Sequence, residues 1–306
     1  MINAQKVWKL KYFTSFGYSL KHSFNLSSVN TLYQYQGKSF SPERLKTYTL
    51  KMLIRDQLLV YVVLDPDNRI IAIREYQASS TSEMLDLIGE IKADDYFLKE
   101  EYGSVQVVSG TLSFSLIPNK FFVSGRVKEF AGTLVRDTAG PGQKPDHLEY
   151  LKMDKTGATA IFTVSNDLKE RCDQHLEGPE YTPACRSQIR MAAELTPPGK
   201  DLLLTTLFSN QFVVTGMKNG RLMLCNAYEY QSAADLVYFI QLVSDMLELD
   251  EQAAVLINGD ISEDGTLFKQ LKEFIPRAEI PTQFLKNRFD LPAEGIPHHR
   301  FAFLSF

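Results

Sequence analysis

Residues 68–91 read NRIIAIREYQASSTSEMLDLIGEI, and residues 220–243 read GRLMLCNAYEYQSAADLVYFIQLV. The two stretches align without a gap at a constant offset of 152 residues, about half the chain. Each follows an apolar run and a turn, and each passes from a second strand into a helix whose apolar residues recur at i, i+3, i+4 and i+7. We therefore interpret them as two copies of one strand-turn-strand-helix unit.

The predicted helices of both copies begin with a capping-box pattern, Ser80-x-x-Glu83 in the first and the weaker Ser232-x-x-Asp235 in the second. A duplication predicts that Tyr76 and Tyr228 occupy equivalent positions in the two halves. The alternative is a chance resemblance, because strand-turn-strand-helix segments are common in proteins. The aligned apolar helix positions are Met84 with Leu236, Leu87 with Phe239, Ile88 with Ile240, and Ile91 with Val243.

Composition limits the class of partner. The chain has 306 residues and a formal net charge of −4, and it contains no cluster of Lys and Arg, which nucleic acids and anionic membranes require. No apolar run is long enough to span a bilayer, and the N-terminal residues lack the apolar stretch of a signal peptide. Three cysteines cannot all pair, and free thiols fit a reducing compartment. We expect a cytoplasmic protein whose partner is another protein.

The order of predicted elements suggests three regions: a leader at residues 1–46 that packs on the first half, a first half at 47–198, and a second half at 199–306. Each half follows the order β-β-β-α-β-α, which indicates an α/β architecture with a mixed sheet in each half. A further helix is predicted near residues 121–135 and a last strand at 301–304. The remaining expected strands are 48–55, 57–64, 69–77, 105–108, 158–164, 202–208, 211–217, 221–229 and 253–258, and the helices are 81–93, 166–175, 184–195, 233–248 and 266–274.

The segment from residue 202 to 260 resembles a Bacteroidetes protein family, domain of unknown function family 3822. The resemblance rests on Asn226-Ala227-Tyr228-Glu229-Tyr230-Gln231, on Leu256-Ile257-Asn258-Gly259-Asp260-Ile261, and in the first half on Ser113-Phe114-Ser115-Leu116-Ile117-Pro118. The resemblance implies an actin-like ATPase fold, in which two ribonuclease-H-like halves face each other across a nucleotide cleft. The duplicated unit supports this fold independently, because each half of such a fold requires the same strand order.

Active proteins of the actin-like superfamily bind phosphate in a hairpin of each half, with glycine in the turn and an acidic residue for Mg²⁺. The first hairpin here, Arg55-Asp56-Gln57, keeps the acid Asp56 but has no glycine. The second, Ser209-Asn210-Gln211, has neither. Gly259 and Asp260 follow a predicted strand at the edge of the expected cleft. An alternative for this last pair is a turn in which Asp260 or Ser262 caps the next helix.

The candidate cleft residues are thus Asp56, Ser209, Asn210, Gly259 and Asp260. Cys172-x-x-His175 with Cys185 offers three possible zinc ligands but no evident fourth, so no metal site is predicted. We predict no catalytic residue and no cofactor. The sequence favours a non-catalytic protein-interaction or regulatory module; the alternative is an ATP- and Mg²⁺-binding protein that contacts phosphate through Asp56, Ser209 and Asn210.

Overall fold

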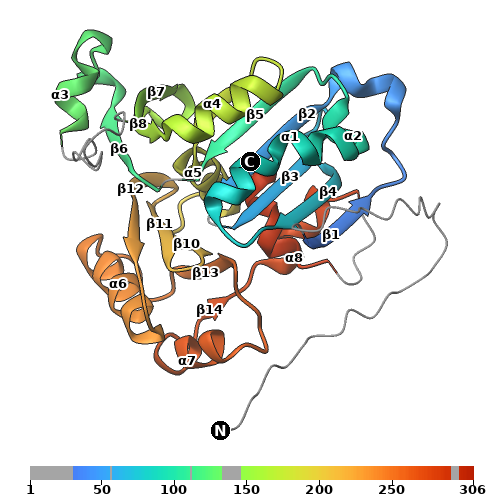
Figure 1. Ribbon diagram of the computed structural model, residues 1–306. Coiled ribbons are helices and arrows are strands. Elements are labelled where there is room, and N and C mark those ends of the chain that lie inside the picture. Colours follow the sequence, from blue (N-terminus) through green and yellow to red (C-terminus); the bar gives the residue numbers. More distant parts are fainter. Residues whose placement is uncertain (1–29, 56, 111, 133–145, 291–295) are drawn as a thin grey trace, which may run out of the picture.

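The computed structural model describes residues 30–55, 57–110, 112–132, 146–290 and 296–306. Within these ranges the chain forms two mixed sheets that lie beside each other, with α5 between them, and a small three-stranded sheet (Figure 1). The first sheet has the order β1-β4-β3-β2-β5-β9 and consists of β1 (Asn30–Gln36), β2 (Thr49–Arg55), β3 (Leu58–Leu64), β4 (Ile70–Gln77), β5 (Ser104–Ser109) and β9 (Glu180–Pro183).

The second sheet has the order β12-β11-β10-β13-β14 and consists of β10 (Leu202–Phe208), β11 (Gln211–Lys218), β12 (Arg221–Glu229), β13 (Ala254–Gly259) and β14 (Ala278–Glu279). The small sheet has the order β6-β8-β7, from β6 (Phe114–Pro118), β7 (His147–Met153) and β8 (Ala158–Val164). The α-helices are α1 (Thr81–Asp94), α2 (Tyr96–Lys99), α3 (Val127–Ala131), α4 (Asn166–His175), α5 (Ala184–Leu195), α6 (Ala233–Met246), α7 (Thr266–Phe274), α8 (Thr282–Leu285) and α9 (His298–Phe301).

The two large sheets share one topology. The order β4-β3-β2-β5 in the first half is repeated as β12-β11-β10-β13 in the second, with the last pair parallel in each case. The pairing register repeats as well, since Tyr76 lies opposite Leu59 and Tyr228 lies opposite Phe212. Even the β-bulge recurs, after Val63 in the first half and after Gly216 in the second. The predicted equivalence of Tyr76 and Tyr228 is confirmed.

The helices that follow these strands also correspond: α1 and α6 both have 14 residues, and both their ends differ by the same 152-residue offset. Ser80 and Ser232 are the N-caps, each accepting a hydrogen bond from the backbone three residues on. Only the second helix has a complete capping box, because Asp235 also accepts from the N–H of Ser232, whereas Glu83 accepts from Ser79. The box predicted to be weaker is the complete one.

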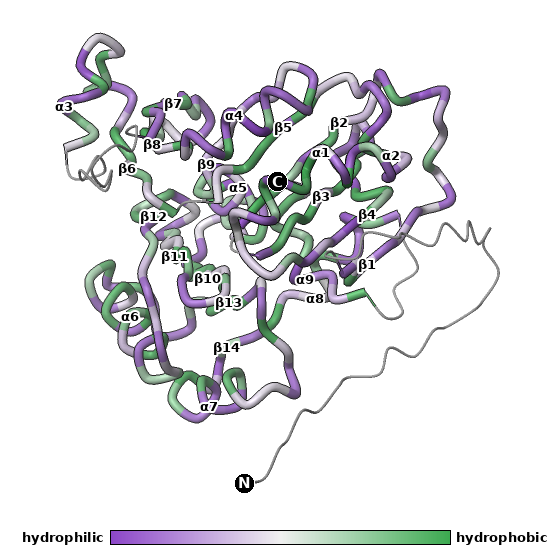
Figure 2. Tube along the Cα trace, in the orientation of Figure 1, coloured by the Kyte–Doolittle hydropathy of each residue, from purple (hydrophilic) through white to green (hydrophobic). Residues whose placement is uncertain are grey.

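The core is built from the strands and from one face of each helix, and the green strands of Figure 2 mark this apolar interior. In α1 and α6 the predicted apolar face is buried, with Ile88 fully buried and Ile240 only 2 % exposed. Helix α5 joins the halves. Its Gln188 donates from Nε2 to the carbonyl oxygens of Leu204 (3.0 Å) and Val213 (3.3 Å) in the second sheet. Its Ser187 accepts a hydrogen bond from the buried Lys51 of the first sheet (2.9 Å).

Two predicted elements differ in the structure. Residues 301–304 are not a strand: α9 runs into a 3-10 turn (Ala302–Ser305) that packs in the first core. A four-residue apolar run does not by itself distinguish a strand from a buried helical turn. The helix expected near 121–135 is reduced to the short α3, preceded by two 3-10 turns, and residues 133–135 lie outside the described part.

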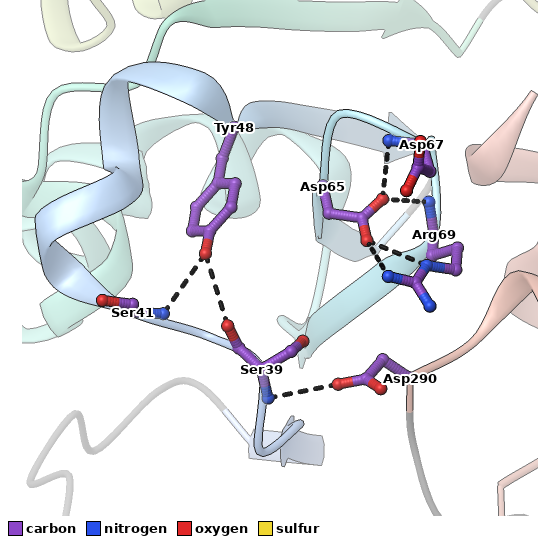
Figure 3. A network of polar contacts seen from close by, with 7 residues as sticks. All are labelled: Ser39, Ser41, Tyr48, Asp65, Asp67, Arg69 and Asp290. Carbon is purple, nitrogen blue, oxygen red and sulfur yellow. Dashed lines mark hydrogen bonds and ion pairs between the residues drawn. The ribbon is translucent and has the colours of Figure 1, made fainter.

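The described part of the predicted leader, from residue 30, joins the first sheet and closes its outer edge. Strand β1 pairs antiparallel with β4, and the chain continues past the β3–β4 turn. Figure 3 shows the polar contacts there: Asp65 accepts from the N–H groups of Asp67 (2.9 Å) and Arg69 (2.8 Å), and the N–H of Ser39 donates to Asp290 (3.1 Å). Segments from both ends of the chain therefore cover this edge.

Candidate functional site

The tips of the two predicted phosphate hairpins and the end of β13 meet in one small cavity. Its walls come from β2 and β3, from β10, from β4, and from the C-terminal segment. The cavity volume is about 50 Å³, room for only a few water molecules. The lining residues include Arg55, Leu58, Glu75, Leu207, Phe208, Ser209, Gly259, Asp260, Arg300, Phe301, Phe303 and Leu304.

Aromatic side chains occupy the space between the hairpins. Phe303 of the C-terminal segment packs edge-on against Phe208 at the end of β10, with ring centroids 5.4 Å apart. The guanidinium of Arg55 lies 4.8 Å from the centre of the Phe208 ring on the other hairpin, and it donates to Oε1 of Gln211 (3.2 Å). Cation–π packing and a hydrogen bond thus hold the two hairpin tips together.

Arg300 carries the main electrostatic contact of the cavity. Its Nη2 lies 2.5 Å from Oε1 of Glu75 in β4, and its Nε lies 3.0 Å from Oδ1 of Asp260 after β13. Glu75 is fully buried, and burial raises the pKa of its carboxyl to about 7, although the positive charge of Arg300 opposes this rise. One guanidinium therefore pairs with two carboxyl groups, one from each half.

Ser209 and Asn210, which were predicted to contact phosphate, form hydrogen bonds within the second hairpin. The carbonyl oxygen of Ser209 accepts from the hydroxyl of Tyr230 (2.8 Å), and that of Asn210 accepts from the backbone N–H of Tyr230 (2.9 Å). The N–H of Ser209 points to Oδ2 of Asp260 at 3.4 Å. Asp56 lies outside the described residues. The structure thus brings Ser209 and Asp260 together. Asn210 instead takes part in the backbone hydrogen bonding of the hairpin.

Gly259 is required by the packing of two parallel strands. Its φ is +87°, and a Cβ atom there would lie 2.1 Å from the carbonyl oxygen of Leu207 on β10. The alternative prediction that Asp260 or Ser262 caps the next helix is wrong, because the N-cap of α7 is Gly265, without a side-chain acceptor. Asp260 instead pairs with Arg300.

Sequence reasoning missed Glu75, Arg300 and Phe303 as parts of this site. Glu75 and Arg300 are 225 residues apart, and each sits in a segment whose pattern predicts only secondary structure. Arg55 was seen only as a neighbour of Asp56. No local motif in the sequence indicates these contacts, which depend on the path of the C-terminal segment.

The cysteine and histidine pattern does not form a site in the described residues, where no three His, Cys, Asp or Glu side chains are grouped so as to hold a metal ion. Cys172 and Cys185 are fully buried. Burial raises the pKa of the Cys172 thiol to about 12 and that of Cys185 well above its ordinary value, which disfavours the thiolate that zinc requires.

Two duplicated sheet-and-helix units that face each other across a cavity are the arrangement of an actin-like ATPase fold. The chain belongs to the family described as "Protein of unknown function (DUF3822)", which matches residues 37–278. A Bacteroides thetaiotaomicron VPI-5482 protein with an actin-like ATPase fold and unknown function is similar, with a TM-score of 0.65 and 16 % identity over 79 % of this chain and 93 % of that one. The fold predicted from the sequence is confirmed.

Weaker likenesses extend to other proteins. The PilM-PilN type IV pilus biogenesis complex gives a TM-score of 0.47 at 12 % identity, over 84 % of this chain and 96 % of that one. The ethanolamine utilization protein EutJ from Carboxydothermus hydrogenoformans gives 0.44 at 10 %, over 89 % and 92 %. These similarities are too low to support an argument. No curated protein matches the chain. Among the described residues, no helix is both long enough and apolar enough to cross a membrane.

Proposed function

We propose that this protein is a non-catalytic module of actin-like fold that acts through protein interactions, and that its cleft does not bind ATP. The observation that carries the proposal is the C-terminal segment, whose Arg300, Phe301 and Phe303 line the cavity between the hairpins. Residues 47–198 and 199–306 are, in this proposal, the two ribonuclease-H-like halves, and the C-terminal segment reaches back to the first core. Three free, buried cysteines support a place in the reducing cytoplasm.

The chemistry of the cavity supports this reading. A nucleotide needs several backbone N–H groups aimed at phosphate oxygens and a carboxylate available to Mg²⁺. In the described residues, the N–H of Ser209 faces a carboxylate, and both carboxylates of the cavity, Glu75 and Asp260, are paired with Arg300. An anion placed here would meet apolar rings and negative charge.

The alternative function is nucleotide binding through Asp56, Ser209 and Asn210. It requires the C-terminal segment to leave the cavity and to expose Phe301 and Phe303, which are 1 % and 2 % exposed. Exposing two buried aromatic side chains opposes binding by roughly 1.5–3 kcal/mol for each. This conformational cost would have to be offset by the contacts of the nucleotide.

The test is a thermal melt with millimolar ATP and Mg²⁺. A ligand present at a hundred times its dissociation constant adds about 2.7 kcal/mol to the free energy of unfolding, which raises the Tm by a few degrees in a protein of this size. We expect no shift. A rise of that size in the wild type that disappears in Asp56→Ala would overturn the proposal in favour of nucleotide binding.

A further inference from the structure

Positively charged side chains gather along one side of α5, the helix that joins the two halves. Arg186 and Arg190 are one helical turn apart on α5, so they are neighbours on the same face of the helix. Arg288, from the 3-10 turn that follows α8, forms an ion pair with Glu194, one further turn along α5. Three arginines therefore lie along one face of this helix.

A fourth cation, Lys51 of β2, lies between the first sheet and α5. It is 2 % exposed, and its Nζ donates to Oγ of Ser187 on α5 (2.9 Å). Burial, together with the positive charges of Arg186 and Arg190, lowers the pKa of Lys51 to about 7. The ammonium form of Lys51 is thus opposed by the arginines that follow it on α5.

Two acidic residues lie among these four cations. Lys51, Gln106 and Glu180 are side by side on the neighbouring strands β2, β5 and β9. Glu180 lies 3.9 Å from Nη1 of Arg186 and accepts a hydrogen bond from Nε2 of Gln106 (3.3 Å). The second acid is Glu194, already paired at the far end of the row. When every group is ionised, four positive charges face two negative charges, an excess of two.

Hydrogen-bond donors are left over as well as positive charge. Nη1 of Arg186 is buried and has no hydrogen-bond acceptor among the described residues, because the 3.9 Å to Glu180 is too long for a hydrogen bond. Arg190 is exposed, and within the described part of the chain its guanidinium, which carries five N–H donors, has neither an ion pair nor a hydrogen bond. Unused donors beside an excess of positive charge indicate a site for an oxygen-rich anion.

We propose that this face of α5 binds a small tetrahedral dianion, inorganic phosphate, between Arg186 and Arg190. A planar guanidinium donates two parallel hydrogen bonds to phosphate oxygens, and two guanidiniums one turn apart on a helix reach the same ion. Lys51 and Arg288 contribute through their charges, because Lys51 is covered by the helix and Arg288 is held by its ion pair.

The charge and the size of the site favour a free dianion over other anions. The excess of two positive charges is balanced by one dianion, whereas a carboxylate carries a single charge and leaves one positive charge uncompensated. The unused Nη1 of Arg186 has no contact with solvent, so only a small group reaches it. The nearby carboxylate of Glu180 is already included in this balance of charge.

This anion site is separate from the cavity between the hairpins and shares no residue with its lining. Arg288 precedes Phe289, which forms a bridge with Ile70 at the start of β4. Glu75 of the cavity lies near the other end of that strand. The inference goes beyond the proposed function and does not depend on it, since Asp56→Ala, the variant that tests ATP binding, leaves the anion site unchanged.

Isothermal titration with inorganic phosphate at pH 7.5 and constant ionic strength tests the site. We expect one ion per chain, and a dissociation constant raised at least tenfold in Arg190→Gln, the loss expected when a charged hydrogen-bond partner is removed. The matched control is Arg221→Gln, which removes an exposed arginine at the start of β12 and should keep the wild-type affinity. Circular dichroism melts establish that both variants fold. No binding to the wild type, or equal losses in the two variants, overturns the proposal.

The proton balance of binding tests the contribution of Lys51. A bound dianion offsets the positive charges around Lys51, so this amine should take up a proton when the ion binds at pH 7.5. Sulfate is the probe, because it stays a dianion at this pH whereas phosphate itself titrates. Titrations in two buffers with different enthalpies of ionisation should show proton uptake in the wild type and none in Lys51→Met. Uptake that persists in Lys51→Met, or its absence in the wild type, overturns the part assigned to Lys51.

Discussion

Arg300 of the C-terminal segment lies 2.5 Å from the carboxylate of Glu75 in β4, a contact between residues 225 positions apart in the sequence. The same guanidinium reaches Asp260 at the end of β13. Arg300 therefore links the first sheet, the second sheet and the chain end at one point. This link and the aromatic packing around it join the walls of the cavity between the halves.

Arg300→Gln should destabilise the fold strongly at pH 8. Removing one partner of a buried ion pair leaves an uncompensated charge and costs about 3–5 kcal/mol of unfolding free energy. The loss should be smaller at pH 5, where the Glu75 carboxyl, whose pKa is raised to about 7, is already protonated. Denaturant melts at both pH values measure the difference. An equal loss at pH 5 and pH 8 would contradict a role for the charge of Glu75.

The control for this variant is Lys46→Gln, which breaks the ion pair with Glu101, where both side chains are mostly exposed. Exposed pairs contribute little because water screens them. We expect the melt of Lys46→Gln to be nearly unchanged at either pH. A loss comparable to that of Arg300→Gln would mean that burial does not explain the result.

Glu75→Gln should change how stability depends on pH. The folded-state pKa of Glu75 is about 7, raised mainly by burial from the ordinary value of 4.5. Between these values the folded protein holds a proton that the unfolded chain has released, so this group makes stability fall as pH rises from 4.5 to 7. The slope is at most about 1.4 kcal/mol per pH unit for one group. The unfolding free energy of the variant should lack this fall. If the difference in unfolding free energy between wild type and variant stays constant from pH 5 to 7, Glu75 does not contribute the pH dependence.

The elements could be predicted from the sequence because their signals are local. Helix α6 follows from Ser232 as an N-cap and from the spacing of Leu236, Ile240 and Val243, and it begins at the predicted residue. The small sheet could be predicted from the sequence only in part. Strand β8 was predicted, whereas the residues of β7 alternate in burial and form no strong apolar run. Local patterning fixes an element but does not show which distant strand pairs with it.

The candidate site was predictable only in part. Gly259 could be selected from the sequence because it follows a predicted strand. The reason that glycine is needed there is the close approach of the Leu207 carbonyl oxygen, which depends on the parallel pairing of β10 and β13. The role of Arg300 depends on the C-terminal segment crossing to the first half. Such contacts depend on tertiary structure, and a single sequence carries no periodicity that encodes them.

Lys51→Met should stabilise the protein near neutral pH. Lys51 is 2 % exposed in β2, and burial, helped by the nearby Arg186 and Arg190, lowers its pKa from 10.5 to about 7. Between pH 7 and 10.5 the unfolded chain binds a proton that the folded protein has released, so this group makes stability rise with pH in that window. The variant should be more stable than the wild type at pH 7, with an advantage that shrinks by pH 8.5.

The matched control is Lys99→Met in α2, where the side chain is exposed and its ammonium group remains in water. It should give no advantage that depends on pH. Urea melts at pH 7.0, 7.8 and 8.5 compare both variants with the wild type. If the advantage of Lys51→Met were the same at all three pH values, the gain would come from packing and not from the buried charge.

Ile240→Ala should remove about 2–5 kcal/mol of unfolding free energy, because Ile240 is 2 % exposed and its truncation empties a core site. Ile88→Ala, at the equivalent position of α1 and fully buried, should cost a similar amount if the two copies pack alike. Gln241→Ala, one residue on and exposed, should change stability by less than about 0.5 kcal/mol. Denaturant melts of the three variants measure these changes in unfolding free energy. A loss below about 0.5 kcal/mol for Ile240→Ala would show that this face of α6 is not the core of the second half.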